Sequence, residues 1–194
     1  MDAARPKEQA TVDPRVLRTR KDVLFAVVQV LLDEGWEAFG HARVAQVAGY
    51  SKATVYAHWP TREALLRDAF SLIGATPHHE PTGDMRRDML TELLSFRTGM
   101  VELRLDRVLA VLSDLTHSIP ELVDVRNSLV ADGERVVREL LGQHVRGADL
   151  EAATLMLCGA VLHSALMHGE PLTDEVVTAS VEMVLRGIGG SAVT

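Results

Sequence analysis

Proline interrupts helices, and the seven prolines of this 194-residue chain stand only where a helix would begin or be interrupted. Between them, apolar residues recur at helical spacing, and the strict alternation typical of a strand never persists beyond a few residues. The sequence therefore predicts an all-α fold with about nine helices. The prolines are Pro6, Pro14, Pro60, Pro77, Pro81, Pro120 and Pro171.

Capping residues indicate where these helices begin and end. Asp13 is placed to cap a helix that starts at Pro14, Gly49 fits a left-handed C-cap, and Ser51 and Thr61 fit N-caps. Three glycines at 187, 189 and 190 are expected to end the last helix. The expected helices cover residues 14–34, 41–48, 52–58, 61–74, 85–98, 102–117, 120–143, 149–168 and 172–187.

Aromatic and acidic residues are unevenly distributed along the chain. Seven of the eight aromatics lie between residues 25 and 70. The net charge is −7, but residues 1–75 have a balance of +1 and residues 76–194 a balance of −8. The first part can therefore approach a polyanion despite the acidic total. We expect a flexible arm at 1–14, a small aromatic-rich domain at 15–75, and a larger aliphatic domain at 76–194 that begins with a turn-rich linker at 76–83.

Several protein classes are disfavoured by composition. Cys158 is the only cysteine, which rules out an intrachain disulfide framework and fits a reducing compartment. Charges interrupt the apolar stretches, so no membrane span is expected. The polar first residues lack the apolar core of a signal peptide. We therefore expect a cytoplasmic protein without a membrane partner.

An enzyme is the main competing class, and its usual motifs are missing. There is no phosphate-binding loop, dinucleotide fingerprint or HExxH motif, and the segment from Gly49 to Ala53 lacks the final glycine of a nucleophile elbow. His78 and His79 are a weak metal motif, because adjacent histidines point apart. Cys158 is a weak candidate for a soft-metal or redox site. No enzyme activity, metal or cofactor is expected.

The most informative segment is 35–66, where two short helices flank a tight turn, as in a helix-turn-helix. The second helix of that motif, here Lys52 to His58, enters the major groove of DNA. No acidic residue lies between Glu37 and Glu63, as a surface that approaches phosphates requires.

This segment resembles the DNA-binding domain of the TetR/AcrR family of transcriptional regulators. The ordered, ungapped match comprises Gly35-Trp36, Val44-Ala45, Ala48-Gly49, Ser51, Val55-Tyr56, His58-Trp59, Glu63 and Leu65. The chain departs from the family pattern at Gly40, where Ser or Thr is usual, and at His41, which is usually apolar. It also departs at Tyr50, at Trp59 and at Pro60-Thr61-Arg62.

The resemblance implies which side chains face DNA. Tyr56 and the hydroxyls would bond phosphates, and Lys52 and Thr54 could reach base edges. A solvated helix face is the competing interpretation for Lys52 and Thr54, and core packing is the competing interpretation for Tyr56. Trp59 is expected in the core. The implied DNA-binding residues are Arg43, Ser51, Lys52, Ala53, Thr54, Tyr56, His58 and Arg62. The cationic run upstream of this segment indicates a basic arm with Arg18, Arg20 and Lys21 as further candidates, although it could be a solvated charge run.

The resemblance also implies a homodimer that binds a palindromic operator as a repressor and is released by a small-molecule effector. An effector-independent DNA-binding dimer is the alternative. An apolar stripe on the last helix and small residues on the preceding one suggest the interface, although both could instead pack into the protomer's own core. The expected interface residues are Leu157, Val161, Val177, Val181, Val184 and Ile188. The candidate effector contacts, each of which could instead be plain core packing, are Phe96, Met100, Leu112, His117, Met156, His163 and Met167.

Overall fold

The computed structural model describes residues 13–73 and 78–190. Within these ranges there are nine α-helices, one short π-helical turn and no strand, which confirms the all-α prediction. Contacts divide the chain into two compact units, Met1–Ala69 and Phe70–Thr194. Residues 1–12 of the expected arm (1–14) and residues 76–77 of the expected linker lie outside the described residues, and Pro14 is already the first residue of a helix.

The first unit is built from α1 (Pro14–Glu34), α2 (His41–Ala48), α3 (Lys52–His58) and the first part of α4 (Arg62–Ile73). The caps lie where the sequence predicts them. The Asp13 carboxylate accepts from the Arg15 amide, and the Ser51 hydroxyl accepts from the Thr54 amide. Gly49 ends α2 with φ of 76°, a conformation that glycine adopts without steric cost.

The core of this unit fills the space between α1 and the helix-turn-helix. Val23, Val27 and Val30 line one face of α1 and are fully or almost fully buried. Val55 and Trp59 anchor α3, and Leu65 and Leu66 anchor α4. The apolar residues that recur at helical spacing in the sequence are therefore the residues that pack into the core.

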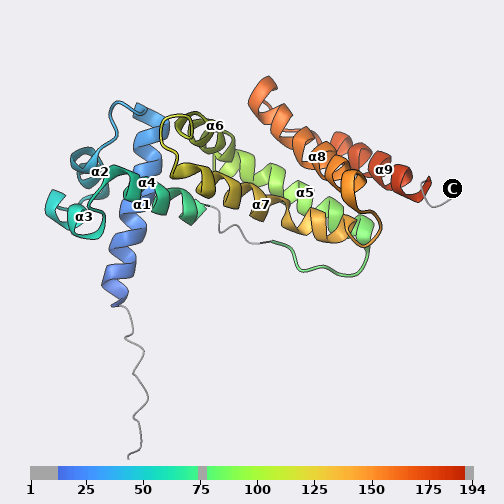
Figure 1. Cartoon of the computed structure of the whole chain (residues 1–194), viewed down its shortest axis with the longest axis horizontal. Helices are drawn as coiled ribbons and strands as arrows, with labels where there is room; N and C mark the ends of the chain where they lie inside the picture. Colours follow the sequence, from blue (N-terminus) through green and yellow to red (C-terminus); the bar gives the residue numbers. More distant parts are fainter. Residues whose placement is uncertain (1–12, 74–77, 191–194) are drawn as a thin grey trace, which may run out of the picture. The chain divides into compact units, whose positions relative to one another are not determined.

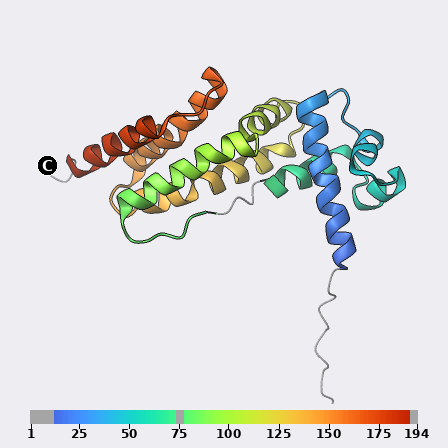
Figure 2. The same ribbon diagram turned by 180° about the vertical axis from the view of Figure 1, so that it is seen from behind.

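The second unit contains α5 (Met85–Glu102), α6 (Leu105–Leu115), α7 (Leu122–Leu141), α8 (Gly147–His163), the π-helical turn η1 (Ser164–His168) and α9 (Asp174–Gly190). In both views α5 lies beside α7, and α8 beside α9 (Figures 1 and 2). One apolar core links α5, α7, α8 and α9.

Two predictions about this unit are corrected. Helix α9 continues through Gly187 and Gly189, because Val184 and Ile188 beside them pack against the core and hold that turn. The run Gly147–His168 has a mean hydropathy of 1.6 and by length and composition could cross a membrane. Its acidic residues stand only near its start, so charge does not interrupt it as expected. Because one face of this run packs into the core, its apolar character needs no membrane.

Candidate nucleic-acid interface and interior cavity

Helix α3 presents one face to solvent and is fixed by the other. Val55 is 0% exposed and Trp59 1%, so residues one helical turn apart hold the helix against the unit's core. Lys52, Ala53 and Tyr56 lie on the outer face, and Tyr56 is 43% exposed. The helix is thus a firmly anchored element with a cation and a phenol pointing outward.

The turn before α3 sets the direction of its first residues. The amide of Thr54 donates to Ser51 Oγ at 3.0 Å, and the two hydroxyls lie 2.8 Å apart. This bond satisfies one of the free amides at the helix start. Ser51 is exposed and Thr54 half-buried, so both hydroxyls remain at the rim of the outer face.

His41 positions the phenol of Tyr56. The two rings are stacked at 4.0 Å between centroids with 4° between their planes. His41 Nε2 lies 2.7 Å from the carbonyl oxygen of Trp59, and the His41 side chain is buried. Lys52 Nζ is 5.5 Å from the centre of the same Tyr56 ring. The only sequence signal for this role was a polar residue where the family has an apolar one.

Trp59, which follows α3, is buried in the core of the first unit, as predicted. Its Nε1 donates to Asp68 Oδ2 at 2.9 Å, and Arg20 donates to the same oxygen at 2.8 Å. The Arg20 guanidinium also lies 5.0 Å from the centre of the Trp59 ring. Arg20, expected in the basic arm, is therefore held by the fold, whereas Arg18 and Lys21 are exposed.

Arg43 and Arg62 also have partners within this unit. Arg43 contacts the Glu34 carboxylate at 2.7 to 3.1 Å; this hydrogen-bonded pairing lowers the pKa of Glu34 and raises that of Arg43. Arg62 lies 4.4 Å from the centre of the Trp36 ring. His58 is half-buried, with its ring 5.5 Å from that of Trp59. Of the expected phosphate contacts, Lys52 and Tyr56 project outward most plainly.

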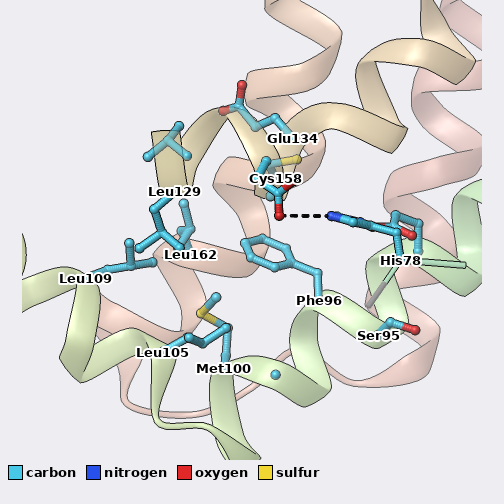
Figure 3. A pocket seen from close by; sticks show the side chains of 15 residues that line it. His78, Ser95, Phe96, Met100, Leu105, Leu109, Leu129, Glu134, Cys158 and Leu162 are labelled. Atoms are coloured by element: carbon cyan, nitrogen blue, oxygen red, sulfur yellow. Dashed lines mark hydrogen bonds and ion pairs between the residues drawn. The ribbon is translucent and has the colours of Figure 1, made fainter. Parts of the chain in front are cut away.

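The second unit encloses a cavity of about 80 Å³ between α5, α6, α7 and α8. Its wall is mostly apolar and includes Phe96 and Met100, two of the residues expected to contact an effector. Figure 3 shows Phe96 between Met100 and the polar end of the cavity. Burial raises the pKa of the Cys158 thiol in this wall to about 12, so it is present as the thiol.

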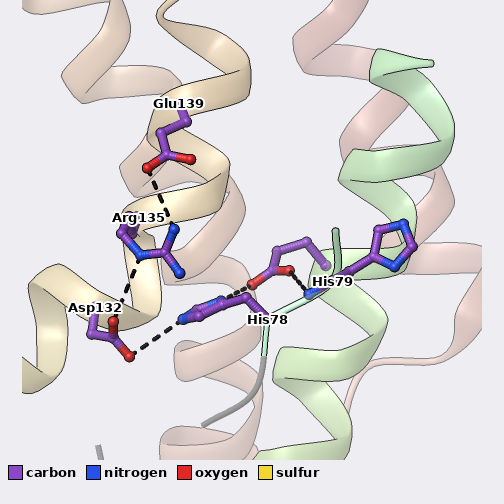
Figure 4. A network of polar contacts seen from close by, with 6 residues as sticks. His78, His79, Asp132, Arg135 and Glu139 are labelled. Carbon is purple, nitrogen blue, oxygen red and sulfur yellow. Dashed lines mark hydrogen bonds and ion pairs between the residues drawn. The ribbon is translucent and has the colours of Figure 1, made fainter. Parts of the chain in front are cut away.

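The polar end of the cavity is organised around His78. Its Nδ1 lies 2.7 Å from Glu92 Oε1 and its Nε2 3.3 Å from Asp132 Oδ2 (Figure 4). Burial alone would lower the pKa of His78, but the hydrogen bonds to Glu92 and Asp132 outweigh it and raise the pKa above its usual value. Asp132 is 54 positions from His78 in the chain, so no local sequence signal pairs the two residues.

The other expected effector contacts do not line this cavity. Leu112 is 0% exposed in core packing. The exposed His117 ring lies near backbone carbonyls of its own turn. Met156, His163 and Met167 are exposed on the surface of α8 and η1. Within residues 13–73 and 78–190, no three His, Cys, Asp or Glu side chains converge as a metal site would require.

Comparison with known proteins identifies the fold and the family. The family model described as "Bacterial regulatory proteins, tetR family" matches residues 24–69, which include α2 and α3. The solved TetR family transcription regulator SCO0332 is 32% identical; the alignment covers 88% of this chain and 98% of that one, with a TM-score of 0.61. The chain belongs to the TetR family. It is therefore a DNA-binding transcriptional regulator.

Other relatives agree with this assignment. The chain is 26% identical to the uncharacterized HTH-type transcriptional regulator YdeS of Bacillus subtilis, over 93% of this chain and 95% of that protein. It is also 26% identical to the DNA-binding transcriptional repressor TetR of Mycobacteroides abscessus, over 86% and 92% of the two chains. The solved flavonoid-responsive regulator FrrA shares the fold, with a TM-score of 0.70 at 17% identity over 90% and 96% of the chains.

In this TetR-family chain, four of the expected interface residues belong to the protomer's own core, which corrects their assignment to a dimer interface. Leu157, Val161, Val177 and Val181 are at most 2% exposed and pack in the core of the second unit. Val184 and Ile188 are half-buried and line a surface groove of about 530 Å³ between α8 and α9. These residues do recur at helical spacing, but they lie on the faces of α8 and α9 that pack into the protomer's own core.

The outer faces of α8 and α9 carry a second set of apolar side chains. Leu155, Met156, Val176 and Met183 are 54%, 65%, 46% and 66% exposed. Ala152 and Gly187, small residues, line the groove beside Met156 and Met183. We call Leu155, Met156, Val176 and Met183 the outer stripe.

Proposed function

We propose that this TetR-family regulator acts as a homodimeric cytoplasmic repressor. It binds a palindromic operator through two copies of α3 and is released by a small molecule that enters the cavity of the second unit. The observation that carries this proposal is the outer face of α3, with Lys52 and Tyr56 exposed on a helix that Val55 and Trp59 hold rigidly.

The proposed contacts follow from the chemistry of the outer face. The Tyr56 hydroxyl and the Ser51 hydroxyl suit phosphate oxygens, whereas Lys52, at the start of the helix, suits a guanine edge. Ala53 leaves room for the close approach of a base pair or a thymine methyl. Arg43 and Arg62 already have partners within the protein. We therefore expect them to add to the positive potential around α3 and not to contact phosphates as free cations.

Dimerisation would place two such helices on one duplex. A symmetric pair reads two half-sites about 34–36 Å apart or a multiple of that distance. The outer stripe supports the pairing, because four large apolar side chains on adjacent helices gain free energy when a second copy covers them.

The cavity supports a ligand-responsive mechanism. A small molecule that binds one conformation of the second unit better than another would shift the population of the DNA-binding form. A difference of about 2–3 kcal/mol is enough for roughly 30- to 150-fold release. Among the similar proteins, the one called FrrA is described as flavonoid-responsive and the M. abscessus protein as a repressor.

Selection of bound duplexes from a random DNA pool tests the proposal. The expected product is a palindrome, bound with an affinity that falls steeply as salt increases. Lys52→Ala should weaken binding to the selected duplex by about tenfold to a hundredfold, as expected for loss of one base contact. Arg107→Ala, an exposed cation of the second unit, is the matched control and should leave binding unchanged.

Three results would contradict parts of this function. If the selected duplexes share no common sequence, an architectural dimer that binds DNA without sequence preference is favoured. Equal affinity for wild type and Lys52→Ala would remove α3 as the reading element. Enrichment of a single non-repeated half-site would argue against the symmetric dimer.

A further inference from the structure

The cavity has a charge asymmetry that limits what can bind in it. Among the residues that the structure describes, three acidic side chains and one basic side chain line it: Glu92, Asp132, Glu134 and His78. Arg138 neutralises Glu134 through a contact of 2.9 Å. The polar end of the cavity carries the Glu92 and Asp132 carboxylates beside the His78 imidazole. Arg135, which does not line the cavity, lies 3.7 Å from Asp132 (Figure 4).

The imidazole of His78 lies between two carboxylates, in a position that a cationic group of a ligand could also occupy. It bridges Glu92 and Asp132 from two different helices, and its side chain is only 13% exposed. Glu92 is itself buried, with 6% of its side chain exposed. Because a buried carboxylate is costly unless a donor satisfies it, any ligand that moves His78 away must supply a hydrogen-bond donor in its place, and a positively charged donor satisfies two carboxylates best.

We propose that the cavity binds a small molecule with an apolar body and one cationic amine head, and that the amine replaces the imidazole of His78 between Glu92 and Asp132. The assignment of this molecule as the effector rests on the proposed function, whereas its binding does not. An anionic head would face the same two carboxylates and be repelled.

Gly133 adds an independent indication that the space is kept for a ligand. It lies within α7 in the cavity wall, although glycine is unfavourable in a helix interior. A Cβ at this position would meet no atom within 4 Å, so packing does not require the glycine. Gly133 therefore adds no side chain to the cavity wall beside Asp132.

The size of the cavity indicates the probes. About 80 Å³, together with the space that the displaced His78 imidazole would leave, indicates a body on the order of a single six-membered ring. Cyclohexylmethylamine, cyclohexylmethanol and cyclohexanecarboxylate share that ring and differ in the charge of the head. Isothermal titration calorimetry on the full chain, with each probe separately, gives three dissociation constants that can be compared directly.

The amine is expected to bind at least about tenfold more tightly than the alcohol, because its hydrogen bonds to the carboxylates are charge-assisted, and the carboxylate should not bind. Asp132→Asn should weaken amine binding about fivefold or more and leave the alcohol within about twofold. Asp124→Asn, which removes an exposed carboxylate from the same helix outside the cavity, is the matched control. The imidazole NMR signals of His78 should shift with the amine and not with the alcohol.

Equal binding of amine and alcohol, tighter binding of the carboxylate, or no binding of any probe would overturn the proposal. Unchanged amine affinity in Asp132→Asn would also overturn it. Asp132 is chosen because its side chain is partly exposed, whereas a substitution of the buried Glu92 could unfold the protein. The proposed function fails separately: if the amine binds as expected but random-pool selection yields no operator, the ligand site stands and the repressor function does not.

Discussion

His41 places an imidazole where an apolar side chain would fill the same space. Its Nε2 contacts the Trp59 carbonyl at the end of α3, and its ring supports Tyr56 from below. The residue therefore joins α2 to both the end and the outer face of α3. A hydrogen bond in this position fixes the phenol more narrowly than apolar packing alone would.

His41→Leu tests this contact. The substitution leaves the buried Trp59 carbonyl without its donor, which costs about 1–3 kcal/mol of the free energy of unfolding. Urea denaturation of the full chain measures it. His144→Leu, at an exposed position, is the control and should change stability by less than about 0.5 kcal/mol. Equal stability of His41→Leu and wild type would mean that water or repacking satisfies the carbonyl.

His78 makes stability depend on pH in a defined direction. Because its pKa is raised above 6.5 in the folded protein by Glu92 and Asp132, against the effect of burial, the protonated bridge stabilises the fold below about pH 6.5. This contribution is lost as pH rises through the higher pKa of the folded state. The Tm of wild type should therefore fall more between about pH 6 and about pH 9 than that of His78→Gln. Parallel Tm curves for the two proteins would show that the bridge contributes nothing.

At the scale of single helices, two glycines with equally open surroundings have opposite roles. A Cβ at Gly133 or at Gly49 would meet nothing within 4 Å. Gly133 lies in the interior of α7, whereas Gly49 ends α2 with φ of 76°. The difference between them is backbone conformation, not space.

Gly133→Ala should raise the free energy of unfolding by about 0.5–1 kcal/mol, because alanine loses less conformational entropy in a helix. Gly49→Ala should lower it by about 1–2 kcal/mol, because a side chain is strained in the left-handed conformation. Thermal unfolding of both variants checks the signs. A stabilised Gly49→Ala would mean that the turn before α3 can rearrange without cost.

At the scale of the whole molecule, the two faces of α8 and α9 differ in whether the protomer itself covers them. The inner faces hold Val181 at 0% exposure in the core, and the outer faces hold Met183 at 66%. The two residues are two positions apart in α9, but Val181 points into the core and Met183 toward solvent.

Met183→Glu should keep the fold and weaken dimerisation, giving monomers by analytical ultracentrifugation together with unchanged helicity. Val181→Glu should instead destabilise the protomer by several kcal/mol, because it buries an unpaired carboxylate. A Met183→Glu dimer as tight as wild type would move the interface away from the outer stripe.

The sequence alone determined the features that depend on neighbouring residues. Proline positions, the caps at Asp13, Gly49 and Ser51, and the helical spacing of apolar residues defined α1 to α4 to within about a residue, because capping and periodicity act over one or two helical turns. The ordered pattern from Gly35 to Leu65 was long enough to indicate the family. The burial of Trp59 also followed from it.

Only the tertiary structure decided which side of a two-faced helix is covered and which distant charges meet. Helices α8 and α9 are apolar on both faces, so spacing could not tell Val181 from Met183. The pairing of Arg20 with Asp68, and of His78 with Asp132, joins residues far apart in the chain. Such contacts depend on how helices pack, which local sequence signals do not encode.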